Sequence, residues 1–190
     1  MARISYAIKK EVINLNFYIQ ACNPKTQCTA DCNDETLADA IESVFPLKTE
    51  DAILIWNHIC IPLSYKYDIS YMMDDIIILL NMLQSREKGE LTIHWLPDTF
   101  RCDWTMKWNA ERLDVQSHWE NTVGNLEMLL NEKSHISLKK EDFIKEWKSI
   151  LQIVIAGLKK CGYSVDKIKN MKQLIEQYEN INGSGILYNK

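Results

Sequence analysis

Apolar and polar residues alternate with a period of two along residues 90–119. This period is typical of β-strands that bury one face and expose the other. Turn-forming residues near 97–98 and 109–111 divide the segment, so an antiparallel meander is predicted, with strands over 90–96, 101–108 and 112–119. One face collects the large apolar side chains Leu91, Ile93, Trp95, Cys102, Trp104, Met106, Trp108, Leu113, Val115 and Trp119. We therefore expect the tryptophans to pack in a core rather than to form an exposed binding platform.

A helical period replaces this alternation in residues 34–45. Two opposite stripes follow from the spacing: Leu37, Ile41 and Val44 on one side, and Glu35, Asp39 and Glu42 on the other. Such spacing is typical of an amphipathic helix that packs its apolar stripe on a core. Asn33 or Asp34 is the expected N-cap, and Pro46 follows the end of the helix.

The remaining pattern predicts further helices over 68–88, 121–131, 138–161 and 164–180. Ser70 and Ser137 are the expected N-caps of the first and third of these helices. One or two strands are expected in 52–67, which is rich in β-branched and aromatic residues, and another in the second half of 4–21. The sequence thus predicts a single α+β domain over residues 1–190, with a mostly antiparallel sheet packed against several helices.

The charged residues are unevenly distributed along the chain, and this distribution bears on the kind of partner the protein binds. The chain has 46% apolar and 25% charged residues, which are ordinary values for a folded domain. Its net charge of −4 conceals an acidic segment, because residues 31–75 contain ten acidic and two basic side chains. An acidic field repels nucleic acid and attracts cationic partners. A solvated acidic surface without a partner is the alternative explanation.

The cysteines and histidines do not form a known catalytic or metal-binding motif. Free thiols are the simplest interpretation of the six cysteines. Cys22, Cys28 and Cys32 are close in sequence, but a zinc site would need a fourth ligand, so no metal is expected. Phosphate-binding and hydrolase motifs are also missing from the sequence, so no cofactor is expected. A small enzyme that uses Cys60, Cys102 or a histidine–carboxylate pair is the alternative function.

The ends of the chain and its longest apolar run bear on location. The first residues lead into Lys9, Lys10 and Glu11 rather than into an apolar run, so we expect no signal peptide. The longest aliphatic run, 76–80, is far shorter than the roughly 20 residues of a membrane-spanning helix. We therefore expect a cytoplasmic protein that does not interact with a membrane.

Three short motifs carry a resemblance to a known group of proteins. They are Trp119-x4-Gly124, Leu129-Leu130-Asn131 and Phe143-x2-Glu146-Trp147-x3-Leu151. In order and character they resemble small immunity proteins of bacterial polymorphic-toxin and contact-dependent growth inhibition systems. The resemblance covers roughly residues 90–160, about a third of the chain. It implies a non-enzymatic cytosolic protein that binds one cognate toxin and blocks its active site or surface.

Many toxins of these systems are nucleases with cationic clefts, so the resemblance also gives the acidic segment a role. We expect the partner-binding residues among its carboxylates: Asp31, Asp34, Glu35, Asp39, Glu42, Asp68, Asp74 and Asp75. The expected partner is a cationic protein toxin, and no nucleic acid is expected to bind. A regulatory interaction module without a toxin partner remains a third possibility.

Overall fold

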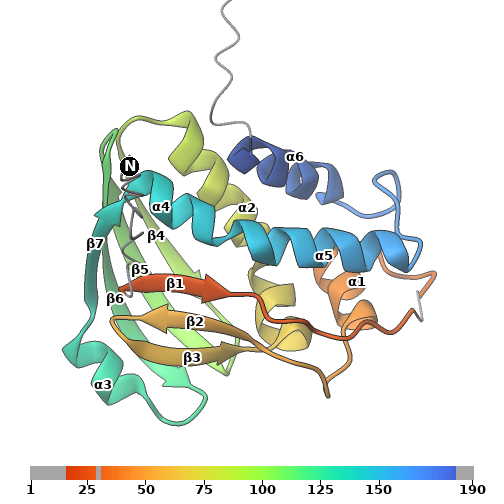
Figure 1. The fold of residues 1–190 in the computed structure, drawn as a ribbon, viewed down its shortest axis with the longest axis horizontal. Coiled ribbons are helices and arrows are strands. Elements are labelled where there is room, and N and C mark those ends of the chain that lie inside the picture. The colour runs from red at the N-terminus through yellow and green to blue at the C-terminus, as the bar shows by residue number, and fades with distance from the viewer. Residues whose placement is uncertain (1–15, 29–30, 183–190) are drawn as a thin grey trace, which may run out of the picture.

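The computed structural model describes residues 16–28 and 31–182, which form two antiparallel sheets and a set of helices (Figure 1). The strands are β1 (Phe17–Gln20), β2 (Ala52–Trp56), β3 (Ile59–Leu63), β4 (Gly89–Trp95), β5 (Phe100–Trp108), β6 (Arg112–Thr122) and β7 (His135–Lys139). The helices are α1 (Leu37–Val44), the π-helix η1 (Tyr65–Ile69), α2 (Ser70–Ser85), α3 (Glu127–Glu132), α4 (Lys140–Glu146), α5 (Lys148–Lys160) and α6 (Met171–Asn182). The predicted α+β class is confirmed.

The predicted meander forms three of the four strands of the larger sheet, whose strand order is β4-β5-β6-β7. Trp104 of β5 pairs with Ile93 of β4 and with Ser117 of β6, as the period-two pattern requires. The fourth strand, β7, was expected to be partly helical. Its residues Ile136 and Leu138 pair instead with Val115 and Leu113 of β6, so the same inward face continues.

A second sheet, of order β1-β2-β3, corrects the expectation of one sheet. β2 and β3 form a tight hairpin because Asn57 and His58 both have positive φ angles, 44° and 69°. Among the described strands, β3 pairs with β2 alone, so the missing N–H of Pro62 in β3 interrupts no second ladder there. The predicted strand in the second half of 4–21 is β1, while residues 1–15 lie outside the described part of the chain.

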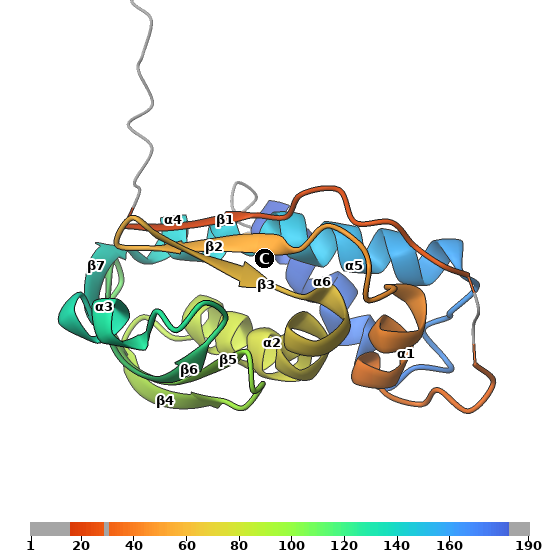
Figure 2. The same cartoon turned by 90° about the horizontal axis from the view of Figure 1, so that it is seen from below.

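The two sheets face each other across a cluster of aromatic side chains (Figure 2). Trp56 of β2 lies 5.2 Å from Trp104 and 5.5 Å from Trp119, measured between ring centroids. Phe17 of β1 stacks on Phe143 of α4 at 4.5 Å. All four tryptophans of the meander, Trp95, Trp104, Trp108 and Trp119, are buried, so the core interpretation is confirmed.

Several predicted helix boundaries are wrong, and each has a local cause. The long helix expected over 138–161 is interrupted at Trp147, and α4 and α5 follow one another along the molecule (Figure 1). Ser137 does not cap it, because its hydroxyl donates to Asp114 within the sheet. β6 runs on to Thr122 and shortens the helix expected over 121–131 to α3. The last helix begins at Met171 rather than near residue 164.

The N-cap of α2 also differs from the expectation. Ile69 is the N-cap of α2 and makes no side-chain capping bond, so Ser70 is not the cap. Ser64 instead caps η1, and its hydroxyl accepts from the N–H of Tyr67. The hydroxyl of Ser70 donates to the carbonyl of Lys66 at 2.5 Å. Across the described ranges, none of the helices combines the length and hydropathy that crossing a membrane requires.

Candidate partner-binding surface

Four of the eight predicted partner-binding residues line one surface hollow beside α1. The hollow has a volume of about 420 Å³. Its walls are formed by Asp31, Asp34, Asp39 and Glu42, together with Gln27, Ser43 and Lys66. We call it the acidic hollow. Its carboxylates come from the loop before α1 and from α1 itself, so the fold gathers charges that the sequence only placed in one segment.

The start of α1 determines where these carboxylates lie. Thr36 is the N-cap, and its hydroxyl accepts from the N–H of Asp39, whose side chain accepts in return from the N–H of Thr36. This reciprocal capping box replaces the expected caps at Asn33 or Asp34. The hydrogen bond from the hydroxyl of Thr36 is also the main reason that the pKa of Asp39 is lowered. Asp39 therefore stabilises the helix as well as carrying charge.

Glu35 does not join the stripe of Asp39 and Glu42, because it precedes the N-cap and lies outside the helix. It is exposed and lines a neighbouring depression with Asp34 and the segment 165–170. Its carbonyl accepts from the N–H of Lys169 at 2.8 Å. The helical spacing that grouped the three carboxylates is thus confirmed only for Asp39 and Glu42.

The loop before α1 is tied to the C-terminal part of the chain. Asp34 is only 7% exposed, and it accepts a hydrogen bond from the hydroxyl of Tyr163. The same tyrosine oxygen accepts from the N–H of Asp31 at 3.3 Å. A disulfide bond joins Cys28 to Cys161, with the two Cα atoms 4.7 Å apart. The free-thiol interpretation is therefore wrong for these two cysteines. They are 133 residues apart, so their spacing in the sequence did not indicate the pairing.

Lys66 places one positive charge at the edge of the acidic hollow. Its ammonium donates to the backbone carbonyl of Glu42 at 2.6 Å. Burial raises the pKa of Glu42, and the nearby Lys66 partly offsets that rise. The hollow keeps an excess of carboxylates, so it can receive a lysine or arginine side chain of a partner.

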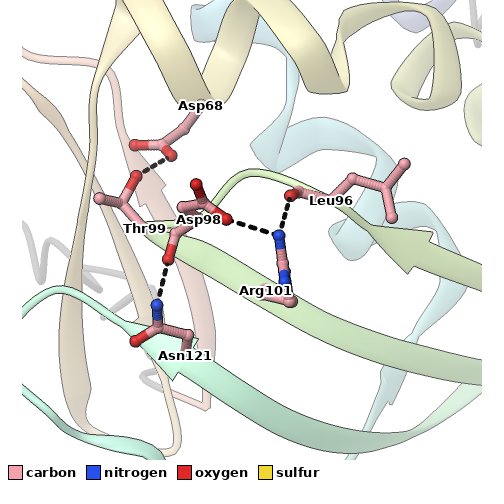
Figure 3. A network of polar contacts seen from close by, with 6 residues as sticks. All are labelled: Asp68, Leu96, Asp98, Thr99, Arg101 and Asn121. Carbon is pink, nitrogen blue, oxygen red and sulfur yellow. Dashed lines mark hydrogen bonds and ion pairs between the residues drawn. The ribbon is translucent and has the colours of Figure 1, made fainter.

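Asp68 is not part of this surface, because it is 1% exposed. Its carboxylate accepts from the N–H of Ser64 at 2.7 Å and from the hydroxyl of Thr99. Figure 3 shows Thr99 reaching it from the turn between β4 and β5, a turn that Asn121 also holds by donating to the carbonyl of Asp98 at 2.7 Å. The prediction that Asp68 binds a partner is therefore wrong. Asp68 instead holds the turn between β4 and β5 against η1.

Asp74 and Asp75 lie on α2, away from the hollow's lining. Asp74 accepts from the side-chain amide of Asn170 at 3.1 Å, which connects α2 to the loop before α6. Asp75 is exposed, and partial burial followed by repulsion from Asp74 raises its pKa. Both carboxylates add negative charge to the surface of α2.

The alternative enzyme function named two cysteines and a histidine–carboxylate pair, and the structure places each of them. Cys102 is buried, and burial raises the pKa of its thiol, so the reactive thiolate is disfavoured. Cys60 is exposed, and within the described ranges no hydrogen bond joins either cysteine to a histidine. A ring nitrogen of His94 lies 2.6 Å from a carboxylate oxygen of Asp103, within hydrogen-bonding distance, on the exposed face of the larger sheet. Among the residues described, no three metal-binding side chains form a group that could hold an ion.

Comparison with protein-family models, curated proteins and solved structures gives no match to this chain. The surface therefore has to be interpreted from its own geometry. Sequence reasoning missed Gln27, Ser43, Lys66 and Tyr163 as its structural components. Only the lysine carried a signal, because it is one of the two basic residues in the acidic segment 31–75.

Proposed function

We propose that this protein neutralises a cognate bacterial toxin by binding it stoichiometrically, without catalysis. The observation that carries the proposal is the acidic hollow, in which four carboxylates from 31–42 surround one depression. Its chemistry suits a protein with a cationic, phosphate-binding cleft, such as a nuclease toxin. The resemblance of residues 90–160 to bacterial immunity proteins supports the same function.

The arrangement of the hollow favours a protein ligand over a free metal ion. Asp39 is held by Thr36 and Asp34 by Tyr163, so both carboxylates are oriented before a partner arrives. Because these side chains are already ordered, less conformational entropy is lost on binding. Their charges also raise the rate of association with an oppositely charged protein. Such association slows as salt screens the charges.

The proposed site of action is the cytoplasm, where a toxin delivered into a bacterial cell reaches its target. Cytoplasmic thiol systems keep most cysteines reduced. The proposal therefore requires the protein to bind its toxin whether Cys28 and Cys161 are joined by the disulfide bond or are free thiols. Asp34 and Tyr163 provide a second, redox-independent connection between the same two parts of the chain.

The proposed function expects a neighbouring gene to encode the cognate toxin domain; we call this domain the adjacent toxin, and the test uses it purified in an inactive form. Wild-type protein should form a one-to-one complex with it in calorimetry and protect cells from the active form. The variant Asp31→Asn/Asp39→Asn/Glu42→Gln removes charge while keeping side-chain shape. It should associate about tenfold more slowly at low salt, and the difference should shrink at high salt.

The matched control is Glu87→Gln/Glu120→Gln/Glu132→Gln, which neutralises three exposed carboxylates remote in sequence from the hollow. Its association rate should stay within about twofold of wild type, since distant exposed charges are screened. A wild-type protein that does not bind the adjacent toxin would contradict the proposed function. Equal slowing of both variants would assign the effect to net charge rather than to the hollow.

A further inference from the structure

The outward face of α2 carries an apolar stripe instead of a purely polar one. Exposed positions of this helix recur at 71, 75, 78, 81 and 85, one for each turn. Tyr71 is 61% exposed and Ile78 is 54% exposed. Tyr67 of η1, one turn earlier, is 44% exposed. The three apolar side chains follow the spacing i, i+4 and i+11, so they belong to one stripe.

This stripe is bordered by negative charge. Asp75 lies between Tyr71 and Ile78 on the same face, and Asp74 adjoins it. The sequence of α2 contains no lysine or arginine. Single exposed apolar residues are ordinary, but three on the same helical stripe offer an exposed apolar surface of the kind found at protein interfaces. Tyrosine is also among the side chains that most often contribute large binding energies there.

The apolar stripe is continuous with the acidic hollow through Lys66. This residue lines the hollow, and its ammonium lies 5.8 Å from the ring centroid of Tyr67. The carbonyl of Glu42 accepts from the same ammonium, so α1 and η1 are held side by side. One ligand surface can therefore cover both features.

We propose that Tyr67, Tyr71 and Ile78 form the apolar centre of the interface with a cationic protein, and that the acidic hollow forms part of its charged rim. The inference rests on the proposed function and names the surface that performs it. A partner would place an apolar side chain against the stripe and basic side chains opposite Asp74, Asp75 and the hollow. Binding energy then comes mainly from the buried aromatic contacts, while the carboxylates set the rate of association.

The experiment measures the affinity of three proteins for the adjacent toxin, and their association and dissociation rates, by surface plasmon resonance. Tyr71→Ala/Ile78→Ser should bind at least tenfold more weakly than wild type, with the loss mostly in the dissociation rate. The control, Met128→Ala, removes a 74% exposed apolar side chain from α3, which lies at the end of the molecule opposite α1 (Figures 1 and 2). It should bind like wild type.

Hydrogen–deuterium exchange of the wild-type complex provides an independent measurement. Amides of 65–78 should become protected when the adjacent toxin binds, while those of α3 should not. Wild-type affinity of the Tyr71→Ala/Ile78→Ser variant, or unprotected 65–78 amides, would overturn the inference and leave the proposed function standing. Failure of wild-type protein to bind the adjacent toxin would overturn both.

Discussion

The carboxylate of Asp34 accepts a hydrogen bond from the hydroxyl of Tyr163, although 129 residues separate them in the chain. Both side chains are buried. Burial, followed by this hydrogen bond to the carboxylate, raises the pKa of Tyr163, so the tyrosine remains a donor through the neutral range. The pair fixes the loop that leads into α1 and hence the position of the acidic hollow.

Tyr163→Phe should therefore destabilise the protein by about 1.5–3 kcal/mol, the range for hydrogen bonds to charged groups whose loss leaves a buried partner unsatisfied. Urea denaturation measures this change in unfolding free energy. Tyr178→Phe is the matched control, because Tyr178 is half-buried and no hydrogen bond of its hydroxyl is found among the described residues. It should change stability by less than about 0.5 kcal/mol. Equal changes in unfolding free energy for the two variants would show that the hydrogen bond from Tyr163 to Asp34 does not stabilise the fold.

The disulfide predicts a definite thiol count. Titration of oxidised, denatured protein should detect four free thiols, those of Cys22, Cys32, Cys60 and Cys102. Cys28→Ser/Cys161→Ser should lower the unfolding free energy by about 2–4 kcal/mol, because the cross-link limits the freedom of the unfolded chain. Cys60→Ser, at an exposed position, should change it by less than about 0.5 kcal/mol. Six free thiols before reduction would contradict the pairing.

Trp104 lies at the centre of the aromatic core, in contact with Phe17, Trp56 and Trp95. Trp104→Ala should cost about 3–5 kcal/mol of stability, the range for truncating a buried large aromatic side chain. Lys107→Ala, at an exposed position of the same strand, should stay within about 0.5 kcal/mol. A small effect at Trp104, measured from denaturant midpoints, would be inconsistent with a core position.

Asp68 should make stability depend on pH. Burial raises its pKa in the folded protein, with the hydrogen bonds from Thr99 and Ser64 opposing that rise. Folding thus favours the protonated carboxyl, a contribution that is complete below the unfolded pKa of about 3.9 and is lost as pH rises through the folded pKa. An asparagine side chain at this position cannot ionise. Its amide oxygen can accept from the N–H of Ser64, and its amide nitrogen can donate to the hydroxyl of Thr99.

The stability of Asp68→Asn relative to wild type should therefore increase between pH 4 and pH 7. Urea midpoints of both proteins at the two pH values give this difference directly. A constant difference would show that the hydrogen bonds balance the effect of burial on the pKa of Asp68, and a difference that decreases towards pH 7 would show that they outweigh it.

The amino-acid sequence by itself determined the elements whose side chains repeat with a local period. The alternation over 90–119 was sufficient to predict three strands and the buried face of Trp104 and Trp119, because adjacent residues of a strand point to opposite sides. The apolar stripe of Leu37, Ile41 and Val44 similarly predicted α1 and its inward face. Local stereochemistry links such patterns directly to structure.

Tertiary structure alone decided which carboxylates share a surface. Asp39 and Glu42 meet Asp31 and Asp34 in one hollow, whereas Asp68 is buried under a turn from the other sheet. The contacts responsible, from Tyr163 to Asp34 and from Thr99 to Asp68, join residues that are 129 and 31 positions apart. Local periodicity carries no information about such pairs, because they depend on how whole elements pack. The acidic segment was thus visible in the sequence, but its division into exposed and buried carboxylates was not.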